Sequence, residues 1–228
     1  MEEYQIKLAL TEHFSQFITD QRKLFTENVL SQRTRHVTLV LEDIYQAQNA
    51  SAAVRTCECL GVQDIHIIEN QNSYGVNKKV VMGSSKWLDI KRYKSKGVNN
   101  TAGCYQSLRD AGYTILATDP SPEGISINDV EVGEKIAVVM GNELEGISDY
   151  AVKHADGKVR IPMFGFTESF NISVSAALCL NTLLLKLRQS DVAWQLPDQQ
   201  LIDLRLTWFR KMVRRSDIIE KEFLRSIQ

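Results

Sequence analysis

The sequence lacks any run of about 18 consecutive uncharged apolar residues, the length that a membrane-spanning helix needs. Its first ten residues, MEEYQIKLAL, are acidic and lack the basic and then apolar layout of a secretory signal peptide. With 228 residues, 43% of them hydrophobic, the chain is long enough for one substantial core with helical appendages. We therefore expect a cytoplasmic protein that binds no membrane.

Cysteine is scarce, and the four cysteines follow no metal-binding or disulfide spacing. Cys57 and Cys59 lie two residues apart in a predicted helix, so their side chains point to different faces. Cys104 and Cys179 lie in separate apolar segments. The spacing predicts buried free thiols and no metal site.

The common nucleotide and hydrolase fingerprints are also missing. No G-x-G-x-x-G follows the first predicted strand, and no G-x-x-x-x-G-K-[ST] loop occurs. The sequence has neither the G-x-S-x-G nucleophile turn nor the H-E-x-x-H zinc helix. These absences exclude the ordinary dinucleotide-binding, P-loop, esterase and zinc-protease readings.

A strong excess of charge of either sign is absent, since the formal net charge is -1. That balance argues mildly against nucleic-acid binding, which favours a basic surface, and we expect no DNA partner. Residues 31–38 (SQRTRHVT) and 208–225 (WFRKMVRRSDIIEKEFLR) are locally basic. Charged helical termini usually form only a solvent-exposed face. We prefer this explanation of the two basic segments to RNA binding unless another signal points to RNA.

Strand-like and helical patterns alternate along most of the chain. Five runs are typical of buried strands: residues 36–43, 64–70, 113–119, 134–143 and 157–163. Helices are expected at 49–62, 98–112, 147–156 and 172–188, and residues 71–87 are expected to form a loop with a brief ordered piece. Strands separated by helices of about ten residues predict an α/β domain whose largely parallel sheet has helices on both faces.

The two ends of the chain have helical patterns. Residues 4–30 predict one helix, and a turn at Pro197 leads to a C-terminal helix that ends near Arg225. The expected apolar face of the first helix is formed by Leu8, Phe14, Phe17, Ile18 and Phe25. We therefore expect an N-terminal helical extension (1–30), an α/β domain (31–190) and a C-terminal helical extension (191–228).

Polar residues gather at three places where a predicted strand gives way to a helix. Asn49 and Arg55 follow the first strand, GNELEG (141–146) follows the most apolar strand, and ESFN (168–171) precedes the last apolar helix. Each has a plain structural explanation, since the two asparagines can cap helices, Arg55 can be a surface cation and GNELEG can be a turn. Ligands bind beyond the carboxyl ends of parallel strands, so three polar tips on one edge together favour a site.

Three stretches resemble the ordered motifs of the SPOUT superfamily of S-adenosylmethionine-dependent RNA methyltransferases, and the match is closest to its SpoU/TrmH branch. They are NASAAVRT (49–56), VVMGNELEGIS (138–148) and IPMFGFTESFNISVSAAL (161–178), with GSSKW (83–87) also matching. The resemblance implies an α/β trefoil knot, an obligate homodimer with composite sites, and methylation of ribose 2′-hydroxyls. The terminal helices resemble those of tRNA (guanosine-2′-O)-methyltransferases, which act on guanosine 18 of the D-loop.

The resemblance also implies roles for individual residues. Main-chain groups near Thr118, Met140, Gly141, Ile161 and Met163 would hold S-adenosylmethionine, with Phe170 adding apolar contact. Ser169, Asn171 and Glu143 would support the polar geometry of the site, and Asn49 would fix Arg55 or contact the ribose. By resemblance and by charge, we expect the RNA phosphates to be bound by Arg33, Arg55, Lys86, Arg210, Lys211, Arg214 and Arg215.

The role of Arg55 and the identity of the substrate have alternatives. Arg55 would act as base or as activator of the ribose hydroxyl, and we favour activation because the guanidinium pKa is above about 12. A ribosomal-RNA methyltransferase of the same fold is the second reading. Many of those relatives carry a separate N-terminal RNA-binding domain, which we do not expect in this protein, and this expectation favours tRNA. A catalytically silent RNA-binding dimer on the same scaffold is the third.

Overall fold

The computed structural model describes residues 3–75, 77–81 and 83–227 of the chain. These residues form two compact units: a helical unit, from the described parts of Met1–Arg33 and Gln195–Gln228, and an α/β unit, Thr34–Trp194. The two terminal segments, which the sequence presents as separate extensions, therefore pack together into one unit. None of the helices in the described part of the chain is long and apolar enough to cross a membrane.

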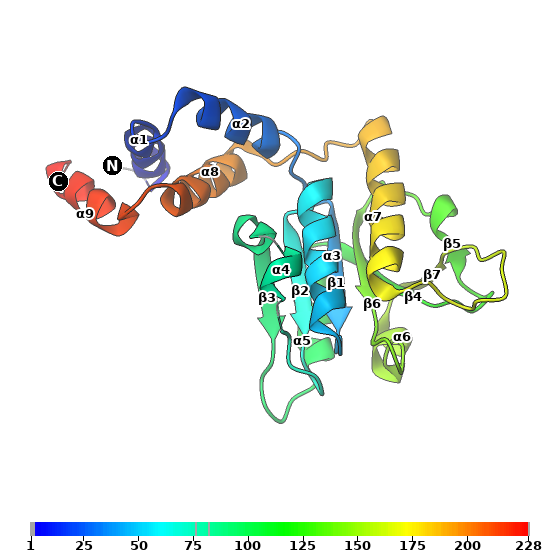
Figure 1. Ribbon diagram of the computed structural model, residues 1–228. Coiled ribbons are helices and arrows are strands. Elements are labelled where there is room, and N and C mark those ends of the chain that lie inside the picture. The colour runs from blue at the N-terminus through cyan, green and yellow to red at the C-terminus, as the bar shows by residue number, and fades with distance from the viewer. Residues whose placement is uncertain (1–2, 76, 82, 228) are drawn as a thin grey trace. The chain divides into compact units, whose positions relative to one another are not determined.

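The α/β unit is built on a seven-stranded sheet with the order β3-β2-β1-β6-β4-β7-β5 (Figure 1). Neighbouring strands pair in parallel throughout. The predicted α/β fold with a parallel sheet is thus confirmed, whereas its knotted threading stays a prediction. The strands are β1 (Val37–Glu42), β2 (Asp64–Ile68), β3 (Asp89–Tyr93), β4 (Tyr113–Thr118), β5 (Ile125–Ser126), β6 (Lys135–Met140) and β7 (Gly157–Arg160).

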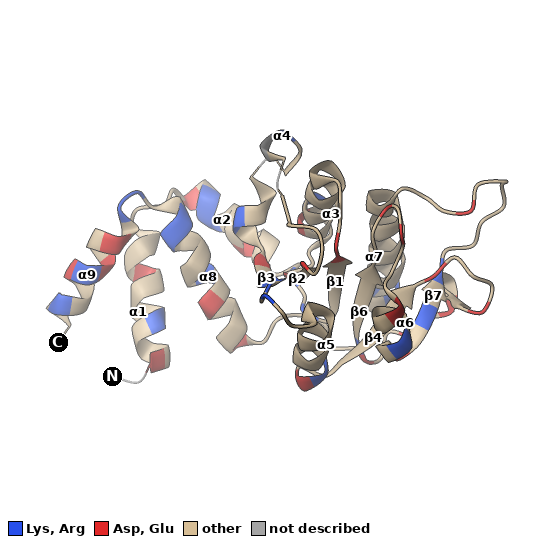
Figure 2. Ribbon diagram, turned by 90° about the horizontal axis from the view of Figure 1, so that it is seen from below, with Lys and Arg blue, Asp and Glu red and all other residues tan. Residues whose placement is uncertain are grey.

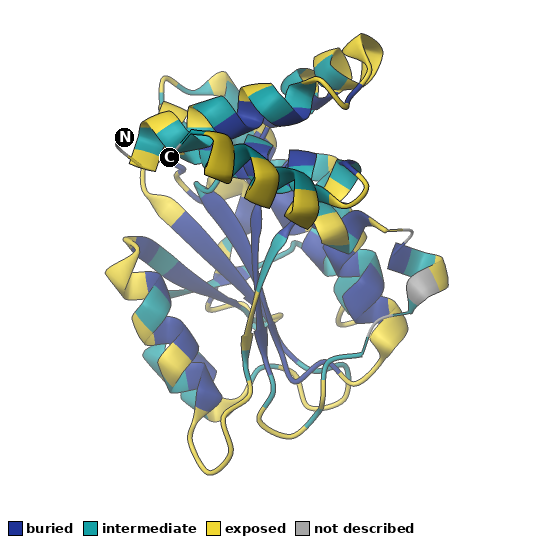
Figure 3. Cartoon of the chain, turned by 90° about the vertical axis from the view of Figure 1, so that its left-hand side faces the viewer, coloured by how far each residue is buried: buried dark blue, intermediate teal, exposed yellow. Residues whose placement is uncertain are grey.

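Helices cover both faces of this sheet. One face packs against α3 (Ala47–Leu60) and α7 (Ile172–Gln189), and the other against α5 (Asn100–Asp110) and α6 (Asp149–His154). Strand β1 shows why: Leu39 and Leu41 belong to the first core and Val40 to the second, as the alternation of side chains along a strand requires. Strands β1, β2, β4 and β6 are largely buried in the middle of the unit (Figure 3). Shorter elements are α4 (Lys78–Val81), η1 (Ser84–Trp87) and η2 (Ile127–Asp129).

Strand β3 and several details of the helices differ from the sequence prediction. No pattern predicted β3, because as an edge strand it carries the polar residues Asp89, Lys91 and Arg92 in place of an apolar run. Cys59 is exposed, whereas Cys57, Cys104 and Cys179 are buried, so the expectation of buried thiols is wrong at one position. In α7, an apolar helix by sequence, Val174 and Leu178 are nevertheless exposed and do not contribute to the core.

The helical unit contains four helices where the sequence predicted two. The first predicted helix is divided into α1 (Glu3–Ser15) and α2 (Asp20–Leu30), because Thr19 has an extended backbone at the start of α2. The last is divided into α8 (Asp198–Met212) and α9 (Ser216–Ser226), because Arg215 has a left-handed backbone with φ of 57°.

The core of this unit contains only part of the expected apolar face. Phe14 and Ile18 are buried with Leu206 and Phe209, whereas Leu8, Phe17 and Phe25 are exposed. The break at residues 16–19 redirects the chain, so the helical period of the sequence no longer describes one continuous face.

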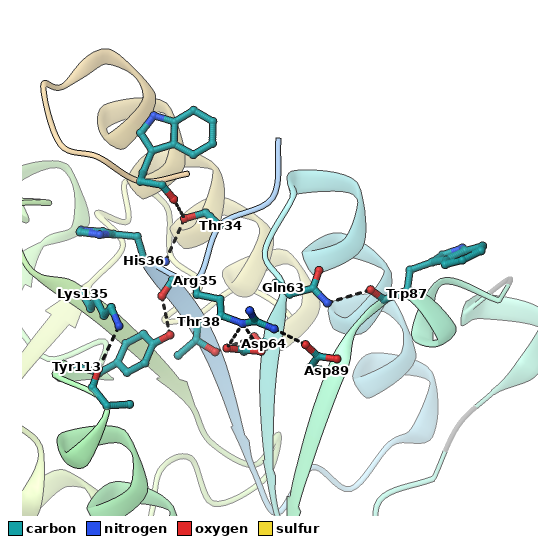
Figure 4. Close-up of polar contacts among 12 residues, drawn as sticks. Thr34, Arg35, His36, Thr38, Gln63, Asp64, Trp87, Asp89, Tyr113 and Lys135 are labelled. Carbon is teal, nitrogen blue, oxygen red and sulfur yellow. Dashed lines mark hydrogen bonds and ion pairs between the residues drawn. The ribbon is translucent and has the colours of Figure 1, made fainter. Parts of the chain in front are cut away.

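The amino ends of the strands are tied together by polar side chains (Figure 4). Nε of Arg35, just before β1, contacts both carboxylate oxygens of Asp64 at 3.2 and 3.1 Å, and its Nη2 contacts Oδ2 of Asp89 at 2.5 Å. The hydroxyl of Tyr113 donates to the carbonyl of Arg35 at 2.6 Å, and that of Thr38 donates to the carbonyl of Asp64 at 2.7 Å. Burial raises the pKa of Asp64, although Arg35 opposes that effect.

We predict that Arg35→Met lowers the free energy of unfolding by about 2–3 kcal/mol, because it leaves the buried Asp64 carboxylate without its cation. Adding Asp64→Asn to the same protein should restore part of the loss, since no buried charge then remains. Urea unfolding followed by circular dichroism measures both changes. A loss below about 0.5 kcal/mol for Arg35→Met, the range of ordinary surface substitutions, would contradict the assignment.

Candidate active site

A cavity of about 730 Å³ opens at the carboxyl ends of four adjacent strands. Its walls come from the segments that follow β1, β6, β4 and β7, which are neighbours in the sheet. The strand order changes direction at β1, which pairs with β2 on one side and with β6 on the other. Ligands of open parallel sheets bind at the carboxyl ends of the strands beside such a point. Among the predicted residues, the lining includes Asn49, Thr118, Met140, Gly141, Glu143, Ile161, Met163, Ser169, Phe170 and Asn171.

A chain of hydrogen bonds joins the three polar junctions. Oε1 of Glu143 accepts from Nδ2 of Asn49 at 2.8 Å, and Oδ1 of Asn49 accepts from Nδ2 of Asn171 at 3.2 Å. Oδ1 of Asn171 accepts in turn from the backbone N–H of Ser173 at 2.9 Å. A carboxylate only accepts and a backbone N–H only donates, so the two ends fix the orientation of both amides between them.

Glu143 also caps the helix that carries Asn49 and Arg55. Its carboxylate accepts from the backbone N–H groups of Tyr45 at 2.9 Å and Gln46 at 3.2 Å, beside the N-terminus of α3. Burial disfavours the ionised Glu143, but the hydrogen bonds from Asn49 and from the backbone outweigh it and lower the pKa. The N-cap residue is Gln46, so the alternative that Asn49 caps α3 is wrong; Asn171 does cap α7.

The loop after β6 is closed on itself. The N–H groups of Asn142 and Gly146 donate to each other's carbonyls at 2.8 and 2.9 Å, and Oδ1 of Asn142 accepts from the N–H of Leu144 at 2.8 Å. A Cβ at Gly141 would lie 2.2 Å from the backbone of Gly146 and Ile147, so only glycine fits there. This turn directs the carboxylate of Glu143 at α3.

A buried carboxylate anchors the far end of this loop. Glu42, the last residue of β1, is 2% exposed. Its oxygens accept from the N–H of Ser148 at 3.0 Å, from the hydroxyl of Ser148 at 2.9 Å and from that of Thr101 at 2.6 Å. Ser148 caps α6, so one side chain joins the loop to the starts of α5 and α6.

Arg55 does not line the cavity of its own chain. It lies six residues beyond Asn49, about 9 Å farther along the axis of α3, on a different side of the helix. Its side chain is exposed, and Nη1 lies 3.5 Å from the carbonyl of Val80 on α4. The sequence placed Arg55 beside the bound donor, and within a single chain the structure does not bring them together.

The cations predicted to bind phosphate fall into different environments. Arg33 is 1% exposed and its guanidinium lies 5.2 Å from the ring of Trp208, so the expectation that it contacts RNA at the surface is wrong. Lys86 is exposed and lies over the ring of Trp87 at 4.4 Å. In the helical unit, Arg210 bonds to Glu220, whereas Lys211, Arg214 and Arg215 are exposed.

Sequence reasoning missed several residues that line the cavity. Asp119 directly follows β4, and its pKa is lowered by the backbone N–H of Ser121 and by Lys158, whose Nζ lies 3.0 Å away. The strand-end rule would have identified it, because YTILATD ends in that aspartate. Arg160 and Leu144 had no comparable signal. Among the described residues, no three His, Cys, Asp or Glu side chains are grouped as metal ligands would be.

We predict that Glu143→Gln loosens the junction between the β6 loop and α3, because an amide has one acceptor oxygen where the carboxylate has two, and its NH2 group cannot accept from a backbone N–H. Backbone amides of residues 45–49 and 142–148 should exchange about tenfold faster in hydrogen-exchange measurements. Glu134→Gln, which removes an equal charge from an exposed site before β6, is the control. Equal exchange in both variants would contradict the prediction.

The same carboxylate predicts a pH dependence. The folded-state pKa of Glu143 lies below its ordinary value of 4.5, so ionised Glu143 stabilises the folded state above that pH. Its contribution is lost as the pH falls through the lowered pKa. Protection of residues 45–49 should therefore be constant from about pH 8 to 5 and fall only in stronger acid. A transition near neutral pH would contradict the assignment.

Known proteins resemble this chain in both sequence and fold. The sequence model of the SpoU rRNA Methylase family matches residues 36–181. The tRNA (guanosine(18)-2′-O)-methyltransferase of Borreliella burgdorferi is 41% identical over 206 residues, which cover 90% of this chain and 92% of that protein. A tRNA-modifying TrmH/SpoU enzyme of Aquifex aeolicus superposes with a TM-score of 0.75 at 26% identity, over 86% of this chain and 98% of that one.

A more distant structure shares the fold. The SpoU methyltransferase AviRb of Streptomyces viridochromogenes, solved in complex with AdoMet, has a TM-score of 0.57 at 21% identity, over 72% of this chain and 62% of that one. The family match covers well over half of the chain, and it includes the three junctions that surround the cavity. The chain belongs to the SpoU methylase family.

Proposed function

We propose that this protein transfers a methyl group from S-adenosylmethionine to the 2′-hydroxyl of guanosine 18 in the D-loop of tRNA. The observation that carries the proposal is the cavity whose walls are joined by the Glu143–Asn49–Asn171 hydrogen bonds. The relative that is 41% identical across nearly the full length of both chains supports guanosine 18 as the target. The proposal keeps the cytoplasmic location expected from the sequence.

The cavity fits the donor in size and lining. Its volume of about 730 Å³ lies within the range of small-molecule sites, and Met140, Ile161, Met163 and Phe170 supply apolar surface. The Thr118 hydroxyl already bonds to the Val139 carbonyl, so polar contacts with the donor at Thr118 and Gly141 would come from main-chain groups, as the family resemblance implies. When bound there, the donor would supply an electrophilic methyl group on a sulfonium.

The residues of the chain would position this reaction and stabilise its charge. Glu143, Asn49 and Asn171 hold the cavity walls in register, and Ser169 lies exposed at the rim, where it would contact donor or ribose. Arg55 would organise a substrate phosphate and stabilise the developing alkoxide with its positive charge. A guanidinium stays protonated because its pKa is above about 12, so Arg55 cannot serve as the base. The proton would instead pass to a phosphate oxygen of the substrate.

A homodimer would explain how Arg55, which does not line the cavity of its own chain, takes part in the reaction. The family resemblance implies composite sites, in which Arg55 of one chain would serve the cavity of the other. Val174, Leu178 and Leu185 form an exposed apolar line along α7, at spacings that keep them on one side of the helix. Phe164 and Phe166 are fully exposed on the loop before it. Apolar surface of this extent supports a buried interface in the assembled protein.

The substrate is tested with labelled donor and two transcripts of one tRNA, one with guanosine at position 18 and one with adenosine there. We expect label only in the first, and nucleoside mapping should place it on the ribose of residue 18. The family description favours a second candidate, rRNA. Labelling of 23S rRNA fragments but not of tRNA would replace the tRNA proposal, and no transfer to either would support a silent RNA-binding dimer.

We predict that Arg55→Ala lowers kcat by about 10²–10³-fold, the usual effect of removing a group that stabilises transition-state charge. Arg55→Lys keeps the charge but loses the planar fork, so its kcat should lie between the two. The affinity for S-adenosylmethionine should not change in either variant, because the role proposed for Arg55 concerns the substrate phosphate and the alkoxide and not the donor. Near-normal turnover by Arg55→Ala would refute the role given to Arg55.

A second prediction tests the composite site. Arg55→Ala and Gly141→Ala should each be inactive, the second because a Cβ would collide with the backbone of its loop. When the two are coexpressed with different tags, heterodimers should regain one working site, giving about a quarter of wild-type activity in an equal mixture. No recovery in heterodimers purified by both tags would place Arg55 and the cavity of one site in the same chain.

A further inference from the structure

One segment of the α/β unit is far more basic than the chain as a whole. Residues 77–96 contain seven Lys or Arg and a single acid, Asp89, whereas the complete chain has 27 Lys and Arg against 28 Asp and Glu. The rest of the chain is therefore clearly acidic, and the near-neutral total conceals this segment.

Three cations that lie together in and after β3 make no ion pair within 4 Å with another described residue. Arg92 is engaged by Glu69, at 2.7 Å from Nε to Oε1 and 2.8 Å from Nη2 to Oε2. Lys91, Lys94 and Lys96 are exposed, and no carboxylate of the described residues lies within 4 Å of their ammonium groups. Most other cations of the α/β unit have a carboxylate or carbonyl partner; examples are Arg35, Arg109, Lys135, Lys158, Arg160, Lys186 and Arg188.

These lysines lie along the edge of the sheet and continue to its carboxyl side. Lys91 is in β3, which has a neighbour on one side only, and Lys94 and Lys96 follow the last residue of that strand. Because all the strands are parallel, the segment after β3 lies at the same edge as the cavity. Figure 2 shows cations on the ribbon beside β3. Three strand spacings, about 14 Å, separate β3 from β6.

The lysine segment is held in place by the buried side chain of Asn100. Oδ1 of Asn100 accepts from the N–H of Ser95 at 2.9 Å, and its Nδ2 donates to the carbonyls of Ser95 at 3.1 Å and Glu69 at 3.2 Å. The N–H of Asn100 donates to Oδ1 of Asn70 at 2.9 Å. Asn100 is 5% exposed, so Ser95, between Lys94 and Lys96, is fixed to the neighbouring loop.

That neighbouring loop is fixed in turn to the end of β1. Oδ1 of Asp43 accepts three backbone N–H groups, from Asn70 at 2.7 Å, Gln71 at 2.8 Å and Asn72 at 3.1 Å. Asp43 follows β1 directly, and its carbonyl accepts from Nδ2 of Asn142 in the β6 loop at 2.9 Å. Hydrogen bonds therefore connect the lysine segment to the wall of the cavity, and the three charges have a defined position relative to it.

We propose that Lys91, Lys94 and Lys96 form a binding surface for the phosphate backbone of the RNA whose ribose enters the cavity. This inference rests on the proposed function. Unpaired cations on a fixed segment attract a polyanion without reading its bases, and each contact releases a counterion. RNA is favoured over an acidic protein or an anionic membrane because the surface shares its edge with the cavity that must receive the ribose.

The test is a triple variant, Lys91→Gln with Lys94→Gln and Lys96→Gln, in the full-length protein. Its dissociation constant for the tRNA transcript is measured over a range of KCl concentrations. The slope of log affinity against log salt should become shallower by about 2, since each lost phosphate contact contributes about 0.7–0.9. KM for tRNA should rise about tenfold or more while kcat at saturating tRNA is retained, because backbone contacts bind substrate and transition state alike.

The matched control is Lys153→Gln, compared with Lys94→Gln alone. Lys153 is exposed in α6 and also lacks an ion pair among the described residues. It lies near the end of α6, just before the amino end of β7, whereas the cavity lies at the carboxyl ends of the strands. Only Lys94→Gln should change the salt slope. Equal effects of the two single variants would overturn the proposal, since charge alone would then be sufficient. Unchanged affinity for S-adenosylmethionine verifies that the triple variant is folded.

The outcomes separate this surface from the proposed function. A wild-type protein that methylates guanosine 18, with a triple variant of unchanged KM and salt slope, would overturn the surface alone. A wild-type protein that binds tRNA through these lysines without methylating it would overturn the function and support the surface. Full tRNA binding by the triple variant, with loss of binding to phosphatidylcholine–phosphatidylserine vesicles, would overturn the surface in favour of a membrane.

Discussion

The Glu143–Asn49–Asn171 hydrogen bonds are the constraint on which the rest of the site depends. They connect residues 94 and 122 positions apart in the sequence, and they place the loop after β6, the start of α3 and the start of α7 against one another. Because the carboxylate and the Ser173 N–H determine the direction of every bond, the network has one arrangement. The cavity is therefore the space that remains among segments already fixed by their polar side chains.

The sequence predicted where this site would form but not how its parts are joined. Parallel strands end at one edge, so Asn49, Glu143 and Asn171 were expected to meet, and they do. Their pairing had no signal, because a hydrogen bond between residues about a hundred positions apart leaves no periodic trace in the sequence. The same applies to Glu42, an ordinary strand residue in the sequence, whose buried carboxylate connects Ser148 and Thr101.

Local patterns failed where a single residue changes the course of the backbone. The helical period continues through Thr19 and Arg215, yet the extended backbone of one and the left-handed backbone of the other end their helices. Arg33 was assigned to the surface because it is charged, whereas the structure buries it beside Trp208. The basic segment at residues 77–96 was visible in the composition, but its significance depends on Asn100 and Asp43, which hold it near the cavity. Position, more than charge, distinguishes these lysines.

The closed turn after β6 has a consequence for any attempt to re-engineer the protein. Position 141 has no room for a side chain, because its neighbours are backbone atoms that have no alternative rotamer. The carboxylate of Glu143, two residues farther on, is hydrogen-bonded to the start of α3. The next side chain, that of Leu144, is 79% exposed. Directed evolution toward a bulkier alkyl donor should therefore accept substitutions at residue 144. A library randomised at position 141 should return glycine almost without exception.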